Sequence, residues 1–246
     1  MSTTGNVGPA RPQSGQKRNK SKRAEIRAKR RKEEQRNRII IICAIAVVSL
    51  VIAAILIIPN LPKDNLKAIS LPENMNFPQE NKNAIGDPDA PLKIEEFYDF
   101  NCSHCLDYAL NLEDTIIKNY VETGKVYIVS YSFAFLDATS YTAAQAAYCA
   151  MDQGKYWEYK QIAFYNASLG KADPYSNENL INYADKLGLD KKTFTTCLEN
   201  KTYEKKLTED MQYGEANGVT GTPSFLINGK TYGQVDLEQA IIDALK

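Results

Sequence analysis

Hydrophobic and polar residues divide this chain of 246 residues into three regions of different character. The first region, residues 1–38, is strongly polar. The second, residues 39–58, consists mostly of Ile, Ala, Val and Leu and contains no Asp, Glu, Lys or Arg. In the third region hydrophobic residues recur with a period of two in some stretches and with a helical period in others. This mixture is typical of a domain built from both strands and helices.

The apolar region predicts a transmembrane helix over residues 39–58. Twenty residues at about 1.5 Å per residue span roughly 30 Å, which is the hydrocarbon thickness of a bilayer. A cleaved signal peptide is the alternative, but its apolar core should be shorter. The small-residue site Ala44-Ile45-Ala46 lies only five residues into the run, and the run ends at Ile57-Ile58-Pro59-Asn60 without another such site. We therefore expect an uncleaved anchor that contacts membrane lipid.

The distribution of charge predicts how this anchor is oriented across the membrane. Residues 1–38 carry a net charge of about +10, and the residues after the apolar run carry about −10, so the overall balance of zero hides two opposite regions. Basic residues beside a transmembrane segment favour the cytoplasmic side, which places residues 1–38 inside and the acidic region outside. We expect a disordered tail that is attracted to anionic lipid. Nucleic acid is not an expected partner, because the tail lacks aromatic residues and a periodic apolar face.

The region after the anchor begins with a stretch that lacks sustained periodicity. Residues 59–86 are rich in Pro, Asn and Lys, which predicts an extracytoplasmic tether. Residues 87–246 are enough for one well-buried domain. Leu92–Phe100 and Lys125–Phe133 predict two strands. The helix expected between them ends at Gly124, and four residues should share its inner face: Leu106, Leu110, Ile117 and Val121.

The second half of this domain is mostly helical by its pattern. A helical period dominates from Thr139 to about Gly218, and we expect an all-helical insertion over about residues 138–201. Ser224–Ile227 and Lys230–Tyr232 flank Asn228-Gly229, which predicts a hairpin. Asp236 and Gln239 resemble a capping box that opens a last helix, whose inward residues should be Leu237, Ile241, Ile242 and Leu245. The fold class predicted is α/β with a helical insertion.

Two cysteines flank the only histidine of the chain, in the order Cys102-Ser103-His104-Cys105. Thiols at this spacing can close a small disulfide, and an imidazole between them favours the thiolate. Since a strand precedes the motif and a helix follows it, Cys102 should lie at a helix N-terminus, where backbone amides and the helix dipole also favour a thiolate. We expect Cys102 to be the exposed nucleophile and Cys105 to be the more buried resolving thiol. Stabilising the reduced form in this way makes the disulfide a stronger oxidant.

A zinc site is the alternative interpretation, since Cys-x-x-Cys also supplies half of a tetrahedral ligand set. Such a site would need a second close pair of ligands. Cys149 and Cys197 lie 48 residues apart, and the sequence has no second histidine. We therefore expect no metal and no other cofactor, with the Cys102–Cys105 disulfide itself as the redox group.

The segment Glu96-Phe97-Tyr98-Asp99-Phe100-Asn101-Cys102-Ser103-His104-Cys105 resembles the active-site segment of the DsbA-like thiol:disulfide oxidoreductases. The resemblance continues through residues 143–159 (AAQAAYCAMDQGKYWEY), 187–190 (LGLD), 194–198 (FTTCL) and 218–225 (GVTGTPSF), and it covers roughly residues 87–246. It implies a thioredoxin-like fold with an all-helical insertion, here preceded by one N-terminal transmembrane helix.

The resemblance also implies a substrate-binding loop. In that family the proline at the position of Pro223 is cis and faces the active-site disulfide. The residue before it, here Thr222, offers its backbone to the substrate chain. A cis bond before proline costs little compared with other cis peptides and turns the chain sharply. An ordinary trans proline at the start of a strand is the alternative.

A third implied feature is a buried acid. The family has one at the position of Glu96, six residues before Cys102, which implies that this carboxyl transfers the proton of Cys105. A solvated acid on the strand is the alternative for Glu96. Its neighbour Glu95 must point to the opposite face, and Asp99 is a further candidate.

The remaining cysteines suggest a structural bridge. Four cysteines outside the membrane allow three pairings. Pairing Cys102 with Cys105 by proximity leaves Cys149 with Cys197, and some DsbA-like members carry a structural disulfide between these helices. Two buried free thiols are the alternative. Ser103 departs from the family, since many members have proline there, and the dipeptide between the cysteines tunes their potential.

Together these features imply a protein-disulfide oxidoreductase in the cell membrane, with its N-terminus cytoplasmic and its catalytic domain extracytoplasmic. It is expected to introduce disulfides into unfolded or exported proteins that carry thiols. The family implies a membrane reoxidant of the DsbB or VKOR type as a partner. The alternatives are a reductase or isomerase of extracytoplasmic disulfides, and a tethered binding or chaperone module of the same fold that has no catalytic role.

Overall fold

The computed structural model describes residues 14–57 and 69–246, which fall into two units, residues 1–63 and 64–246. The first unit contains the helix α1, Ser14–Ile57. Residues 14–38 were expected to be disordered, but they form the first part of this helix. The reason is their composition, because Ala, Arg, Lys, Glu and Gln all favour helix. Expectations for residues 1–13 and 58–68 fall outside the described residues.

Residues 39–52 of α1 are exposed, and each large hydrophobic residue from Ile39 to Ile52 is more than half uncovered. Within the described ranges, one helix is long and apolar enough to cross a membrane, and the candidate span is Lys29–Ala53. This span begins earlier than the expected one because it includes the basic end of the helix. A transmembrane segment therefore remains a candidate by length and composition.

A five-stranded sheet forms the centre of the second unit, in the order β1-β3-β2-β4-β5. The central strand β2, Leu92–Tyr98, pairs in parallel with β3, Val126–Ser132, and antiparallel with β4, Ser224–Ile227. The edges are β1, Ala84–Ile85, and β5, Lys230–Tyr232. Every residue of β2 except Lys93 is buried, as expected for a central strand covered on both faces. The sheet and its helices confirm the thioredoxin-like fold.

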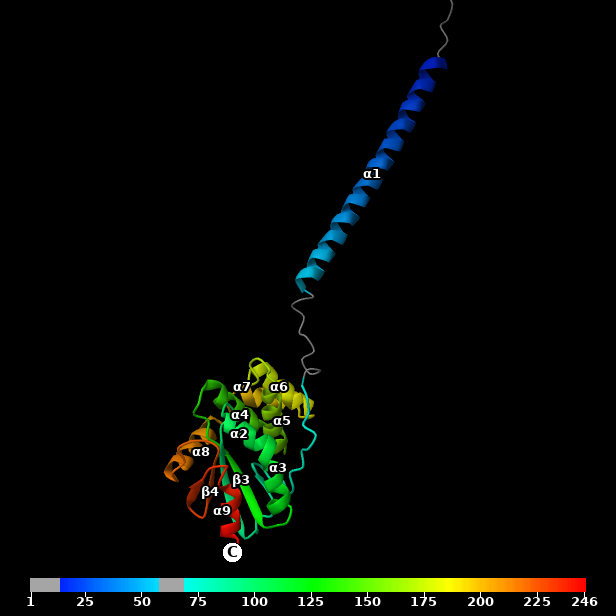
Figure 1. Cartoon of the computed structure of the whole chain (residues 1–246). Helices are drawn as coiled ribbons and strands as arrows, with labels where there is room; N and C mark the ends of the chain where they lie inside the picture. Colours follow the sequence, from blue (N-terminus) through cyan, green and yellow to red (C-terminus); the bar gives the residue numbers. More distant parts are fainter. Residues whose placement is uncertain (1–13, 58–68) are drawn as a thin grey trace, which may run out of the picture. The chain divides into compact units, whose positions relative to one another are not determined.

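Four helices between β3 and the C-terminal strands form the predicted insertion, and Figure 1 shows them gathered at one end of the sheet. They are α4, Ala138–Met151; α5, Tyr156–Ser168; α6, Asn177–Lys186; and α7, Lys191–Glu199. Side chains of Asp137, Ser176 and Asp190 cap the N-termini of α4, α6 and α7 by accepting backbone N–H bonds. A further helix, α8, Glu204–Ala216, packs against β3 and leads into the loop before β4.

The helix that follows the cysteine motif contains two π-helical turns. It runs as α2, Ser103–Asp107; η3, Tyr108–Leu112; α3, Glu113–Ile116; and η4, Ile117–Val121. Along one row of this helix every fourth residue is buried, namely Cys105, Ala109, Glu113, Ile117 and Val121. Beside this row, Tyr108, Ile116 and Tyr120 are also buried. A spacing of four would drift around a regular α-helix, and the wider π turns keep these residues on the inner face. The expected inner residues Leu106 and Leu110 are therefore only partly buried.

The C-terminal elements follow the predicted order but differ in detail. Asn228 and Gly229 both have positive φ, as the predicted two-residue hairpin requires. The last helix, α9, is Leu237–Ala244, but the expected capping box is absent from it. Asp236 has helical backbone angles and its side chain caps nothing, while Gln239 donates to Asp243 instead. Ile242, expected to face inward, is 40% exposed.

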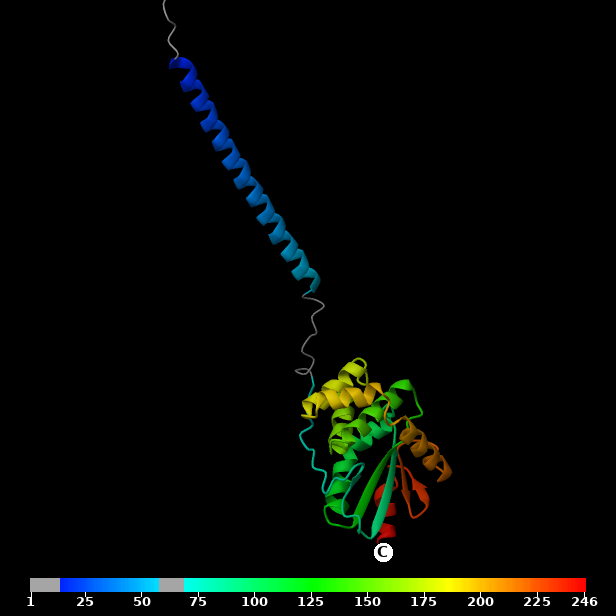
Figure 2. The ribbon, with the colours of Figure 1, turned by 180° about the vertical axis from the view of Figure 1, so that it is seen from behind.

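Residues 69–86, expected to belong to a free tether, pack onto the domain. Ile69 is buried, and the backbone of Ser70 exchanges two hydrogen bonds with the side chain of Asn166 in α5. Ala84 and Ile85 pair with β3. The residues that make these contacts are scattered along the segment without a regular period, so the hydrophobic pattern of the sequence does not reveal them. Figure 2 shows this segment running down the side of the domain.

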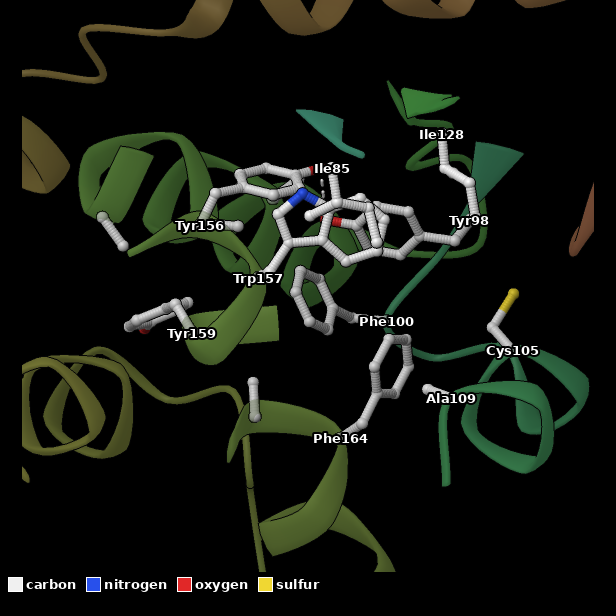
Figure 3. Packing of buried hydrophobic residues seen from close by; sticks show 14 of the residues in the cluster. Ile85, Tyr98, Phe100, Cys105, Ala109, Ile128, Tyr156, Trp157, Tyr159 and Phe164 are labelled. Atoms are coloured by element: carbon white, nitrogen blue, oxygen red, sulfur yellow. Dashed lines mark hydrogen bonds between the residues drawn. The ribbon is translucent and has the colours of Figure 1, made fainter. Parts of the chain in front are cut away.

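Aromatic residues dominate the core between the helical insertion and the sheet. Phe100 and Phe164 lie with their ring centres 4.9 Å apart, and the Tyr98 and Tyr156 hydroxyls lie 3.1 Å apart. Figure 3 shows Phe100 and Phe164 between the helix that carries Trp157 and the helix that carries Cys105 and Ala109. The active-site helix thus rests directly on the aromatic core.

Candidate active site

The loop between β2 and α2 is organised by Asp99, which is fully buried. Its carboxylate accepts N–H bonds from the backbone of Asn101 at 2.8 Å and from Phe135 and Leu136 at 3.0 Å each. It also accepts the Ser140 hydroxyl at 2.5 Å. These donors satisfy the buried carboxylate. Asp99 therefore ties the cysteine loop to the loop after β3.

Cys102 stands at the N-cap of the active-site helix and is partly exposed, whereas Cys105 is buried within the first turn. A hydrogen bond with the Cys105 thiol, opposed by partial burial, lowers the pKa of Cys102 to about 5. Thr222 and the backbone amides of Cys105 and His104 contribute in the same direction. Burial raises the pKa of Cys105 well above its usual range. At neutral pH the pair therefore holds one reactive thiolate and one thiol.

The loop before β4 approaches this pair closely. The Thr222–Pro223 peptide bond is cis, and the carbonyl oxygen of Thr222 lies 3.0 Å from Cys102 Sγ, where it can accept a hydrogen bond from Cys102 in its protonated form. Residues 120 positions apart in the sequence thus meet at the reactive sulfur.

His104 is exposed on the first turn of the helix. Its contribution to the Cys102 thiolate is a backbone N–H bond, as expected of a residue in the first turn. This part of the effect depends on the position of His104 rather than on its imidazole.

Glu96 is buried, but its partner is an ammonium group. The Nζ atom of Lys160 donates to both Glu96 oxygens, at 2.6 and 2.8 Å, and to Glu113 Oε1 at 2.7 Å. Lys160 Nζ also lies 4.9 Å from the Tyr98 ring centre and 4.4 Å from that of Trp157. The thiol of Cys105 instead accepts a hydrogen bond from the backbone N–H of Asp99, the residue after β2, at 3.5 Å. The proton-transfer role of Glu96 therefore remains a prediction.

The cysteines of the helical insertion form a separate bridge. Cys149 in α4 and Cys197 in α7 are joined by a disulfide, with their Cα atoms 5.8 Å apart. This bridge joins two helices of the insertion and leaves Cys102 and Cys105 as the free pair of the domain. Among the residues that the structure describes, no group of three or more His, Cys, Asp or Glu side chains could hold a metal ion.

The sequence did not lead us to expect two buried charged residues near the site, Lys160 and Glu113. Each lies within a helical pattern of apolar residues, at a position that the period assigns to the inside. A charge at such a position is the signal that could have revealed them, because buried charges are almost always paired.

A family model described as thioredoxin matches residues 79–244 of this chain. The chain belongs to the thioredoxin family. Together with the similar proteins described next, this match also confirms the DsbA-like character expected from the cysteine segment.

Similar proteins of known name fall into two groups. The chain is 27% identical over 160 residues to "Probable disulfide bond formation protein D" of Bacillus anthracis, covering 63% of this chain and 74% of that protein. It is 28% identical over 149 residues to "Na(+)/H(+) antiporter NhaA 3" of Salinispora tropica, covering 60% of this chain. The chain spans only 22% of the length of that antiporter, so the likeness concerns one part of it.

Solved structures show the same fold at lower identity. DsbA of Chlamydia trachomatis superposes with a TM-score of 0.58 at 23% identity, covering 70% of this chain and 96% of that one. Oxidised BdbD of Bacillus subtilis superposes with a TM-score of 0.59 at 18% identity, covering 72% and 99%. The chain therefore matches nearly the full length of both structures.

Proposed function

We propose that this chain is a membrane-anchored thiol:disulfide oxidoreductase that introduces disulfides into exported proteins through Cys102 and Cys105. The observation that supports this most strongly is the unequal environment of the two sulfurs. Cys102 is partly exposed, has a lowered pKa and faces the cis Thr222–Pro223 loop, while Cys105 is buried with a raised pKa. A stabilised thiolate in the reduced form favours acceptance of electrons, which is the property of an oxidase.

The reaction follows from this geometry in two exchange steps. A thiolate of the substrate attacks the Cys102 sulfur of the oxidised enzyme, the Cys102–Cys105 bond breaks, and Cys105 leaves and takes a proton. The second substrate thiolate then attacks the substrate sulfur of the mixed disulfide and releases Cys102 as a thiolate. The substrate loses two electrons and gains a disulfide, and the enzyme pair is reduced. The low pKa of Cys102 speeds its departure in the second step.

The substrate is expected to lie along the loop at Thr222 and Pro223. The Thr222 carbonyl is already within hydrogen-bond distance of the reactive sulfur, so a peptide bound to the same backbone would bring its cysteine to Cys102. An extended chain can add to exposed backbone in this way regardless of its sequence, apart from the cysteine. Unfolded or exported proteins with thiols are therefore the proposed substrates.

The same proposal includes location and turnover. The candidate span Lys29–Ala53 would anchor the domain, and the excess of basic residues before the apolar run favours a cytoplasmic N-terminus and an extracytoplasmic catalytic domain. Continued oxidation needs an electron acceptor, for which we propose a membrane enzyme of the DsbB or VKOR type. The names of the relatives, disulfide bond formation protein D among them, support the same reaction class.

The test is the oxidation of a reduced, unfolded test protein by the full-length chain in detergent or nanodiscs. The oxidised wild type should transfer one disulfide per molecule, and Cys102→Ser should abolish transfer. Cys43→Ser removes a cysteine outside the domain and serves as the matched control, which should keep full activity. Transfer that survives Cys102→Ser would overturn the redox function and leave the binding-module alternative. Efficient reduction of substrate disulfides by the reduced chain, without oxidation, would instead favour a reductase.

A further inference from the structure

The buried cluster of Lys160, Glu96 and Glu113 carries more acid than base. One ammonium group faces two carboxyl groups, and all three side chains are at most 3% exposed. A net negative charge in the interior is costly, because protein surroundings solvate it poorly. Uptake of one proton by the cluster removes this charge. The cluster is therefore a place where a proton can be bound and released.

Glu113 is the member of the cluster suited to exchange that proton. Glu96 has both oxygens bonded to Lys160, whereas Glu113 receives a single bond from Lys160, on Oε1. Burial and the charge of Glu96, opposed by Lys160, raise the pKa of Glu113 to about 7. The other groups that face it are Asp114 on its own helix and the phenol of Tyr108, whose own pKa rises through burial and the charges of Glu96 and Glu113.

A small cavity beside Glu113 offers a path for water. It has a volume of about 20 Å³, and its polar lining includes Asn74, Asn76, Asp114 and Gln161. Gln161 Oε1 is buried and has no hydrogen-bond partner. A polar cavity of this size with an unpaired acceptor is suited to hold a water molecule. Such a water would connect Glu113 to the surface.

The N-terminal segment 69–86 closes this cavity from outside. Asn74, Asn76 and Phe77 line it, and Asn76 is held by a bond to Glu122 at 2.7 Å. The Phe77 ring packs 5.7 Å from that of Trp157, on which Lys160 lies. Figure 3 shows Trp157 within the aromatic core. The segment that joins the anchor to the domain is thus also the cover of the charge cluster.

Glu113 and Cys105 belong to one continuous helix and to its same inner face, eight residues apart. Reduction of the pair creates a thiolate at the N-terminus of this helix. This charge lies at Cys102, eleven residues before Glu113, and the protein interior between them screens it less than water does. A new negative charge at Cys102 therefore favours the protonated form of Glu113, and by reciprocity protonation of Glu113 favours the thiolate.

We propose that Glu113 is a positioning residue that takes up a proton when the Cys102–Cys105 disulfide is reduced and exchanges it with solvent through the cavity under residues 69–86. This proposal rests on the redox function proposed above. Its reaction balances as follows. A substrate dithiol becomes a disulfide and gives up two electrons and two protons, the electrons reduce the pair, one proton binds Cys105, and the second binds Glu113. Without Glu113 the second proton goes to solvent.

The proton released per reduced disulfide tests this directly. Full-length oxidised chain in detergent is reduced with glutathione in weak buffer containing a pH indicator, between about pH 6 and 8. Two glutathione thiols lose two protons, so Glu113→Gln should release about one proton per disulfide throughout this range. The wild type should release clearly less than one near pH 7. Glu215→Gln, which removes an exposed acid of α8 outside the cluster and the cavity, should behave as the wild type. Equal release by wild type and Glu113→Gln would overturn the proposal.

Two further measurements test the protonation of Glu113 without relying on the oxidase function. Infrared spectra of the reduced wild type should show the carbonyl stretch of a protonated carboxyl that disappears with a midpoint near pH 7, and Glu113→Gln should lack it. This titration requires no substrate, so it holds even if the chain fails to oxidise proteins. Phe77→Ala should open the cavity to water and move the midpoint to lower pH. A midpoint unaffected by Phe77→Ala would contradict the path under the segment.

Discussion

At the scale of single residues, two identical side chains acquire opposite chemistry from their places in the fold. Cys102 lies at a helix N-terminus beside the Thr222 carbonyl, and Cys105 lies one turn further on, in the apolar interior. The spacing Cys-x-x-Cys was sufficient to predict which sulfur would be the thiolate, because helix geometry decides it. The Thr222 contact came only from the family resemblance, since nothing local in the sequence brings residue 222 to residue 102.

The Cys102 thiolate predicts a specific pH dependence. The ultraviolet absorbance of the thiolate in the reduced chain should titrate with a midpoint near pH 5. Since the folded pKa lies below the ordinary value of 9.0, this group stabilises the reduced folded state fully above about pH 9 and progressively less as pH falls through about 5. Cys102→Ser should abolish the transition. A midpoint above pH 8 would contradict the assigned environment.

Removal of the resolving sulfur should trap the substrate. In Cys105→Ala the Cys102 thiolate can attack a disulfide of a substrate protein, and one substrate sulfur leaves as a thiolate. Cys105 is not there to attack the resulting mixed disulfide, so these adducts should accumulate several-fold over the wild type. Non-reducing electrophoresis of cell extracts would reveal them. The double variant Cys102→Ser/Cys105→Ala provides the background. Adducts that persist in that double variant would have to form through Cys43, and the assignment of Cys102 as nucleophile would then be wrong.

At the scale of elements, the periodic pattern predicted strands β2 and β3, the hairpin, and the bounds of the helical insertion closely. It failed where burial is set by single contacts. The active-site helix buries every fourth residue and needs two π turns, which a search at period 3.6 cannot find. Residues 69–86 attach to the domain through Ser70, Asn76 and a two-residue strand, none of which forms a pattern. Lys160 and Glu113 were missed because each takes an apolar position in its helix.

The disulfide between α4 and α7 should stabilise the insertion without taking part in catalysis. It closes a loop of 48 residues, and loss of a native bridge of this kind costs about 2–4 kcal/mol. Cys149→Ala/Cys197→Ala should therefore lower the free energy of unfolding in urea by about that amount. Its rate of disulfide transfer to a test protein should stay within about twofold of the wild type at a temperature where it remains folded. Loss of transfer from a folded variant would contradict this division of roles.

At the scale of the whole molecule, the charge division of the sequence and the candidate span in α1 support a tethered enzyme. The domain and its family are established by the fold and by the match to residues 79–244. The fold class could be predicted because alternation, helical period and turn residues agree with one another. Orientation across a membrane depends on a second partner, the bilayer, and so needs its own measurement.

That orientation can be measured by labelling the cysteines of intact cells with a membrane-impermeant maleimide. After mild reduction Cys102 should react, since it is partly exposed and would face outward. A cysteine placed in the tail, Ser14→Cys in a Cys102→Ser background, should react only after the cells are permeabilised. The opposite pattern would place the domain in the cytoplasm and remove exported proteins as substrates.

The reduction potential of the Cys102–Cys105 pair tests the central claim most directly. It is measured by equilibrating the full-length chain with defined ratios of reduced and oxidised glutathione at pH 7 and counting free thiols. Because the fold stabilises the reduced form through the Cys102 thiolate, we predict a potential above about −200 mV, toward the value of about −120 mV of a strong oxidant such as DsbA. A potential near the value of about −270 mV of thioredoxin would show that the pair is built to reduce disulfides, and would contradict the proposed oxidase.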